Sequence, residues 1–230
     1  MRISLFVAAL ALAAPVYAQS VQLGGDTAFN PLEVATFDTS VPYVLDQAFA
    51  DTHGVPLPSP FQVALPGHDG LHVQSIPAPS SGATVVFVFS QDAPLAQDRA
   101  FLEDLQITRF NLPMYEDAAD PIHERRVFAA GQLETQIFPQ FASSFEGAEI
   151  FAIEAVELGN SSGALQLVAG YFDQQNGDNM MLRAVVLPHP DRPEGYLAIA
   201  NINLDLIPVT DPQTLAATAT GRVLSSWQFQ

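Results

Sequence analysis

Cysteine is absent from the 230 residues, and its absence removes several kinds of site. Without it there is no disulfide, no thiol nucleophile, no thiolate-bound zinc or iron–sulfur centre and no covalently attached haem. The lipid anchor of bacterial lipoproteins also requires a cysteine, so we expect no such anchor. A chain that lacks these cross-links depends on its hydrophobic core for stability.

Lysine is absent too, because all eight basic residues are arginines. Schiff-base chemistry, pyridoxal phosphate and phosphate-binding P-loops each need a lysine amine, and we expect no cofactor. Once the segment that holds Arg2 is removed (see below), seven arginines face 25 acidic residues, a net charge of −18. Such a surface repels nucleic acid and anionic lipid. It is typical of a soluble protein, with a cationic or metal-loaded partner as the alternative.

Long hydrophobic runs are scarce, and the one present lies at the start of the chain. Arg2 is followed by the apolar run Ile3–Ala14, and Val16-Tyr17-Ala18 then matches the small-x-small pattern that a signal peptidase reads. A membrane-spanning helix needs about 20 apolar residues, so we expect no membrane span. The pattern predicts a signal peptide over residues 1–18 and a protein of the bacterial periplasm or of the medium.

Turn-forming residues and prolines divide the remaining chain into two parts. Residues 19–60 are interpreted as an N-terminal arm, in which a short helix opened by Ser40 and closed by Gly54 precedes a proline-rich linker. Residues 61–230 are predicted to form one domain.

The first half of this domain is predicted to begin with strands. Residues 61–65 and 71–76 alternate between apolar and polar side chains on either side of a glycine-rich turn, which predicts a hairpin. Residues 84–89 are β-branched and aromatic, which predicts a strand covered on both faces. A helix opened by Asp92 is expected next, with the apolar residues Leu95, Phe101, Leu102 and Leu105. Residues 107–146 show little pattern apart from a helix start at Asp120-Pro121.

The last third is the clearest part of the sequence. Four apolar runs follow one another at intervals of about 15 residues, which predicts a meander of antiparallel strands. They are Ile150–Val156, Leu165–Phe172, Met180–Leu187 and Tyr196–Leu204. A terminal helix that starts near Asp211 has an apolar stripe ending at Trp227. The predicted fold class is therefore α+β, an antiparallel sheet with helices packed on it, and the alternative is an all-β sandwich.

Two short motifs and the order of the elements carry a family resemblance. FQVALP at residues 61–66 places a proline after a strand, and GRVLSSWQF at residues 221–229 ends a helix with small residues before an aromatic. In these features residues 61–230 resemble the PsbP-like family and its periplasmic relatives of the DcrB type. The resemblance implies a non-catalytic accessory module and transfers no site residues. Residues 107–146 depart from the family pattern.

The segment GNSSG at residues 159–163 matches the G-x-S-x-G pattern of hydrolases, with Ser161 as the nucleophile. That motif requires a strand before the serine and a helix after it. Here residues 164–171 alternate like a strand, and glycine, asparagine and serine are common in loops. The pattern favours a hairpin loop.

Metal binding has one weak candidate, formed by His68, Asp69 and His72. In a hairpin the two imidazoles could converge on zinc or copper together with a distant carboxylate. The flanking glycines indicate a turn, and exposed polar residues in a turn explain the same pattern. Residues 173–184 resemble a calcium loop only superficially, because the twelfth position is Ala184 instead of glutamate.

The run His123-Glu124-Arg125-Arg126 could form an acid–base or anion-binding cluster. Neighbouring residues on a helix or a strand point apart, however, so at most one of the two arginines joins a given site. No pairing of base and nucleophile can be derived, and no catalytic residue is assigned.

The sequence therefore favours an exported, soluble, non-catalytic accessory or binding protein of the bacterial envelope. Its partner would be an envelope protein or a small ligand. The alternatives are a small periplasmic hydrolase and an acidic protein that binds a metal or a cation. An enzyme should bring an acid, a base and a nucleophile together, whereas a binding module should display exposed apolar surface.

Overall fold

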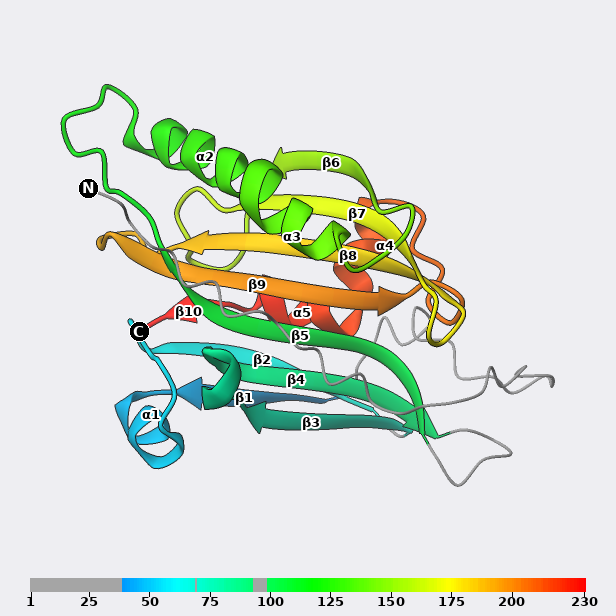
Figure 1. Ribbon diagram of the computed structural model, residues 1–230. Coiled ribbons are helices and arrows are strands. Elements are labelled where there is room, and N and C mark those ends of the chain that lie inside the picture. Colours follow the sequence, from blue (N-terminus) through cyan, green and yellow to red (C-terminus); the bar gives the residue numbers. More distant parts are fainter. Residues whose placement is uncertain (1–38, 69, 93–98) are drawn as a thin grey trace.

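The computed structural model describes residues 39–68, 70–92 and 99–230. A seven-stranded antiparallel sheet forms the centre, with helices against both of its faces and a second sheet of three strands (Figure 1). The predicted α+β class is confirmed. The alternative of an all-β sandwich is wrong, because helices cover part of each face of the large sheet.

The large sheet has the strand order β3-β4-β5-β9-β8-β7-β6. The predicted meander is confirmed, since each of the last four strands pairs antiparallel with the next along the chain. The strands are β3 (Leu71–Pro77), β4 (Ala83–Asp92), β5 (Arg99–Asn111), β6 (Glu149–Ala155), β7 (Leu165–Asp173), β8 (Asp178–Pro188) and β9 (Glu194–Asn203). A single 3-10 turn, η1 (Pro79–Ser81), connects β3 to β4.

The small sheet joins segments far apart in the sequence: β1 (Thr39–Leu45), β2 (Phe61–Gly67) and β10 (Gln228–Phe229). The predicted hairpin of residues 61–65 with 71–76 is wrong, because β2 pairs with β1 and β10 while β3 pairs with β4. Alternation marks both segments as strands, but it does not specify the strand with which each one pairs.

The short N-terminal helix begins later than predicted. Residues from Ser40 to Leu45 form strand β1, and Pro42 is tolerated there because β1 is an edge strand. Helix α1 (Gln47–His53) begins after Asp46, whose carboxylate accepts a hydrogen bond from the backbone N–H of Phe49 at 2.9 Å. It ends as predicted at Gly54, which adopts a left-handed conformation with φ of 64°. The division of the chain at residue 60 stays a prediction.

The helix predicted after Asp92 is wrong where the structure can test it, because residues from Arg99 onward form the long strand β5. Leu95 lies outside the described residues. A β-bulge explains the misleading pattern: Phe89 pairs with Glu103 but Ser90 pairs with Phe101, so Leu102 is an extra residue. The bulge spaces the buried residues Leu102 and Leu105 by three, which imitates a helical period.

Three helical segments in a row cover one half of the front face of the large sheet (Figure 1). They are α2 (Pro121–Gln132), the π-helical turn η2 (Leu133–Ile137) and α3 (Phe138–Ala142). The helix start predicted at Asp120-Pro121 is confirmed, since the Asp120 carboxylate accepts the backbone N–H of His123 at 3.0 Å. Buried side chains of these helices pack on β7, β8 and β9.

The back face is covered by the small sheet and by two short helices, α4 (Pro212–Ala217) and α5 (Ala219–Ser225). The single terminal helix of the prediction is thus interrupted at Thr218. Gly221 allows the two helices to approach closely, because a Cβ atom there would lie 2.3 Å from the carbonyl oxygen of Leu215. Trp227 follows α5, is fully buried and lies in the main hydrophobic cluster.

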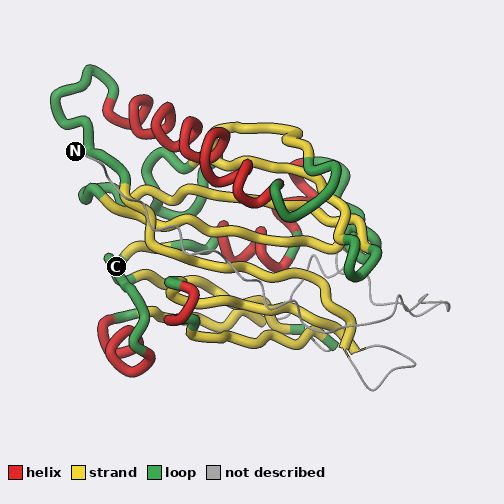
Figure 2. Tube along the Cα trace, viewed as in Figure 1, coloured by secondary structure: helices red, strands yellow, loops and turns green. Residues whose placement is uncertain are grey.

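The rest of the front face has no comparable cover in the described part of the chain. Figure 2 shows the helices over the side of the sheet formed by β6 to β9, whereas no described helix crosses the middle of β3, β4 and β5. We refer to the front-facing side chains of β3, β4 and β5 and their neighbours on β9 as the β3–β5 half-face. Within residues 39–68, 70–92 and 99–230, no helix has the length and apolar character to cross a membrane.

Candidate functional site

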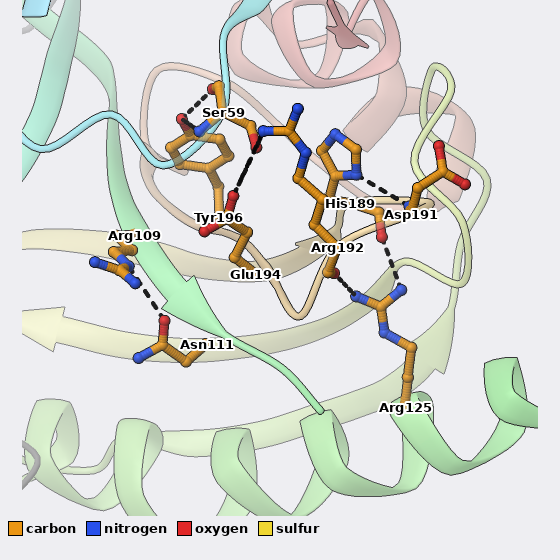
Figure 3. A network of polar contacts seen from close by, with 9 residues as sticks. All are labelled: Ser59, Arg109, Asn111, Arg125, His189, Asp191, Arg192, Glu194 and Tyr196. Carbon is orange, nitrogen blue, oxygen red and sulfur yellow. Dashed lines mark hydrogen bonds and ion pairs between the residues drawn. The ribbon is translucent and has the colours of Figure 1, made fainter. Parts of the chain in front are cut away.

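A polar network at one end of the sheet is the first candidate, because it gathers charged side chains from distant segments (Figure 3). Arg125 extends from α2 to the turn between β8 and β9. It donates hydrogen bonds to the carbonyl oxygens of His189 at 2.7 Å and of Arg192 at 3.1 Å. Only 3% of Arg125 is exposed. This arginine therefore fixes the β8–β9 turn and is not available to a ligand.

Ser59 forms the second part of this network. Its hydroxyl donates to a carboxylate oxygen of Glu194 at 2.9 Å and accepts from Arg192 at 3.2 Å. The hydroxyl of Tyr196 donates to the carbonyl of Ser59, and burial raises the pKa of this tyrosine. A serine beside a carboxylate is a chemically suggestive pair. Ser59 is 0% exposed, however, so no substrate reaches its oxygen.

His189 completes the network but has no nucleophile to activate. Its Nδ1 atom accepts the backbone N–H of Asp191 at 3.0 Å, and its ring packs 4.7 Å from that of Phe229. Burial first, and then the charge of Arg192, lower the pKa of His189, so the neutral imidazole is favoured. The network as a whole joins the β8–β9 turn to α2 and to the segment that precedes β2.

Ser161, the candidate nucleophile of the G-x-S-x-G motif, lies in a loop as the sequence favours. Its hydroxyl donates to the carbonyl of Pro188 at 2.9 Å, and the next element is the strand β7 instead of the helix that the motif requires. Gly159 has a packing role. Its φ is +54°, and a Cβ atom there would lie 1.6 Å from the carbonyl oxygen of Trp227.

The structure also places the other candidates. His68 follows β2 and His72 lies on β3, while Asp69 lies outside the described residues. No group of three or more histidine and acidic side chains that could hold a metal occurs in the described ranges. In the run from His123 to Arg126, Arg125 is buried, whereas His123 and Glu124 are exposed. These neighbours point apart, as expected for consecutive residues of a helix.

The β3–β5 half-face is the second candidate, and it combines polar with partly exposed apolar side chains. Strand register places both sets on the front of the sheet. The apolar members are Ile76, Val86, Val88, Phe101, Phe110 and Ile199, and the polar members are His72, Gln74, Ser90, Asp104, Gln106, Thr108 and Asn201.

A chain of hydrogen bonds crosses the centre of this half-face. The Tyr171 hydroxyl donates to the side-chain oxygen of Asn201 at 3.0 Å, and the Asn201 amide nitrogen donates to the carboxylate of Asp104 at 2.9 Å. Burial raises the pKa of Asp104 to about 6, and the charge of Glu103 adds to this effect. In the described part of the chain no arginine forms an ion pair with Asp104. Asp104 is thus a partly buried carboxylate without a counter-ion.

Gln106 follows two residues later on the same strand and the same face. Only 7% of this residue is exposed, but its amide is not one of the fully buried groups that lack a hydrogen-bond partner. The amide therefore reaches the surface, where it can donate and accept hydrogen bonds. Asp104 and Gln106 together present polar groups on this face, and Asp104 has no counter-ion among the described residues.

We expect the variant Asp104→Asn to be more stable than the wild type near neutral pH. The pKa of Asp104 is raised from the ordinary 3.8 to about 6, so the folded protein binds this proton more readily than the unfolded chain does. The stabilisation is present in acid and is lost as the pH rises through the interval from about 4 to about 6. A pKa difference of about two corresponds to roughly 3 kcal/mol, which partial exposure reduces to about 1–2 kcal/mol.

Urea unfolding at a series of pH values measures this effect. The advantage of Asp104→Asn should shrink as the pH falls towards about 4. Asp117→Asn, which removes the same charge from an exposed loop before α2, should show no comparable pH-dependent gain. An advantage of equal size in acid and at neutral pH would show that the charge of Asp104 is not its cause.

Sequence reasoning did not identify Asp104, Gln106 or Asn201. Asp104 and Gln106 alternate with the buried Leu105 and Ile107, which is the pattern of a strand with one polar face. The bulge at Leu102 hid this pattern behind a helical spacing. Asn201 lies in the predicted strand Tyr196–Leu204, but nothing in the sequence indicates that it lies beside Asp104.

Comparisons with known proteins show a distant likeness of fold. The sequence matches no protein-family model and no curated protein. Similar solved structures include the Ran-binding protein Mog1p of Saccharomyces cerevisiae, with 9% identity over 83% of this chain and 96% of that one and a TM-score of 0.39. Another is LpqN of Mycobacterium tuberculosis, which is involved in cell envelope biogenesis, with 13% identity over 88% and 98% and a TM-score of 0.42. A likeness this distant transfers no activity, partner or residue role.

Proposed function

We propose that this chain is an exported, non-catalytic accessory protein of the bacterial envelope that binds its ligand through the β3–β5 half-face. The observation that carries the proposal is Asp104, a carboxylate without a counter-ion in the described chain, which lies with Gln106 beside partly exposed apolar side chains of the same sheet face. Ligand sites typically combine apolar lining with a few polar groups in fixed positions. The half-face has this composition.

Export and the relation to the PsbP-like family belong to the same proposal. The apolar run Ile3–Ala14, followed by Val16-Tyr17-Ala18, supports a cleaved signal peptide. The opening motif at residues 61–66 lies in β2, and the closing motif at residues 221–229 spans α5 and β10, both in the small-sheet layer. The intact mass of the protein from its native source should correspond to a chain that begins at Gln19, and retention of residues 1–18 would contradict export.

The contacts of the polar candidates favour binding over catalysis. The only serine that bonds to a carboxylate in the described chain, Ser59, is fully buried, and Ser161 bonds to a backbone carbonyl. His189 uses Nδ1 for a backbone N–H, and its pKa is lowered by burial. None of these three groups forms a pair of base and nucleophile that a substrate could reach, which a hydrolase requires.

The test is to map where an envelope component touches the protein. Isotope-labelled mature protein is mixed with native envelope extract, separated by ultrafiltration into small molecules and macromolecules, and its amide NMR signals are recorded. We expect one fraction to shift signals of β4, β5 and β9. Val88→Arg should abolish these shifts, because Val88 lies opposite Asp104 and the longer side chain would occupy the half-face.

Val127→Arg is the matched control, since Val127 is 53% exposed on α2. The same substitution there should leave the shifts unchanged. Shifts confined to other elements, or shifts that survive Val88→Arg, would contradict the proposed site.

A further inference from the structure

We infer that the β3–β5 half-face recognises an organic cation, a ligand with a primary ammonium or guanidinium group, for which Asp104 supplies the counter-ion. This inference rests on the proposed function and names the chemistry of its ligand. It follows from four features of the site: a carboxylate without a counter-ion, the rigid support of that carboxylate, the neighbouring amide of Gln106 and the apolar side chains around both.

The unpaired charge comes first. Burying a carboxylate is unfavourable unless a cation or several hydrogen bonds compensate for the lost water. In the described chain, the hydrogen bonds to Asp104 come from Asn201 alone, through its side chain and its backbone, and the nearby Glu103 adds a repulsive charge. A cationic ligand would supply the missing compensation. Carboxylates with a raised pKa and no counter-ion are also typical of functional sites.

The carboxylate of Asp104 is held in place by a hydrogen-bonded side chain, which reduces the conformational entropy that is lost when a ligand binds. The Asn201 amide is oriented from behind, because its oxygen accepts the Tyr171 hydroxyl while its nitrogen donates to Asp104. Tyr171 in turn packs against two aromatic rings, with its centroid 4.9 Å from that of Phe141 and 4.4 Å from that of Phe145. A carboxylate fixed in this way loses little freedom when a ligand binds.

Gln106 supplies the second polar contact. The residue is 7% exposed, its amide is not one of the fully buried groups without a partner, and it lies on the same face of β5 as Asp104. An ammonium group has three N–H donors and a guanidinium group has five. The carboxylate of Asp104 can accept one of them and the amide oxygen of Gln106 another, so one cationic group could bind to both side chains at once.

The apolar neighbours select an organic cation over a metal ion. Val88 lies opposite Asp104, while Val86 and Ile199 lie on either side of Gln106. These side chains suit the carbon chain of an amine. A metal ion requires several oxygen or nitrogen ligands, and one carboxylate with two amides falls short of such a set. The net charge of the mature chain, −18, attracts cations to the surface in general.

The experiment uses hexylammonium chloride as the probe and 1-hexanol as its uncharged counterpart. Titrations followed by amide NMR signals should show saturable shifts in β4, β5 and β9 for the amine, with at least about tenfold weaker binding of the alcohol. Asp104→Asn should weaken binding of the amine by at least about tenfold, whereas Asp117→Asn should change it less than about twofold. Binding should also decline as the pH falls below about 6, because protonation of Asp104 removes the charge.

Gln106→Leu is a second variant, which leaves the carboxylate of Asp104 intact. It should weaken binding of hexylammonium by about two- to fivefold. A peptide with a single lysine, compared with its norleucine analogue, separates the two sources of the cation. Preference for the lysine peptide over hexylammonium would assign a protein side chain, and the reverse preference a small amine.

Two results would overturn the inference: equal binding of amine and alcohol, or equal weakening by Asp104→Asn and Asp117→Asn. In the first case the site does not recognise the positive charge of the amine. In the second case the amine binds only because of the overall negative charge of the protein surface. If the envelope extract still shifts β4, β5 and β9 in a Val88-dependent way, the proposed function stands and only the cationic ligand is wrong.

Discussion

Replacing Trp227 with alanine should lower the free energy of unfolding by about 3–5 kcal/mol, a large part of the roughly 5–15 kcal/mol that is usual for a domain. The indole is 0% exposed and stacks on Phe61 with a centroid distance of 4.0 Å and an interplanar angle of 12°. Tyr196 and Phe229 pack around it at 5.3 and 5.6 Å. The substitution therefore leaves a cavity where α5, the small sheet and β9 meet.

Urea unfolding followed by circular dichroism measures this loss, because the variant has no tryptophan left to report by fluorescence. Trp227→Phe should cost much less, since it keeps an aromatic ring and also removes an indole N–H that is buried without a partner. Phe151→Ala is the control for an exposed ring, at 61% exposure, and should have a small effect. Equal losses for Trp227→Ala and Phe151→Ala would contradict the buried position of the indole.

Local patterns predicted much of the fold correctly. Four apolar runs at regular spacing predicted the strands β6 to β9 in their observed order, because consecutive antiparallel strands need only short turns. The helix start at Asp120 and the helix end at Gly54 were predicted from capping chemistry alone. In each case the determining interactions lie within a few residues of each other in the sequence.

Features that depend on distant contacts were not predictable. The pairing of β2 with β10 joins Phe61 to Phe229, and nothing in either segment specifies the other. The bulge at Leu102 arises from the register of two strands, and it made a strand resemble a helix. The candidate site has the same origin, since Asn201 lies next to Asp104 only because β9 pairs with β5.

Replacing Glu103 with alanine should also destabilise the protein strongly, with a loss of about 4 kcal/mol or more in the free energy of unfolding. The reason is that several buried hydrogen-bond donors lose their acceptor together. Glu103 is 1% exposed on the back face of β5, where its carboxylate receives the first residues of α5. One oxygen accepts the backbone N–H of Ala219 at 2.8 Å. The other accepts the N–H of Thr220 at 3.0 Å and its hydroxyl at 2.6 Å.

The start of α5 depends on this residue, because the first N–H groups of a helix have no partner within the helix. Thr218 satisfies the N–H of Gly221, and Glu103 satisfies the two N–H groups that precede it. Arg183, buried on β8, is also affected: burial lowers its pKa to about 10, and the charge of Glu103 opposes that change. Removing Glu103 therefore leaves two backbone donors unsatisfied and a buried cation less compensated.

Two further variants separate these contributions from a general loss of acidic charge. Glu103→Gln keeps one acceptor oxygen but places an amide N–H₂ towards other donors, so it should lose about half as much stability as Glu103→Ala. Glu157→Ala removes an exposed acid from the loop after β6 and should cost less than about 1 kcal/mol. Amide hydrogen exchange at Ala219, Thr220 and Gly221 gives the specific measure. In Glu103→Gln these amides should exchange faster than those of β8, because the start of α5 opens before the sheet does. Equal acceleration of exchange across the whole domain would show instead that Glu103 stabilises the core without fixing the start of α5.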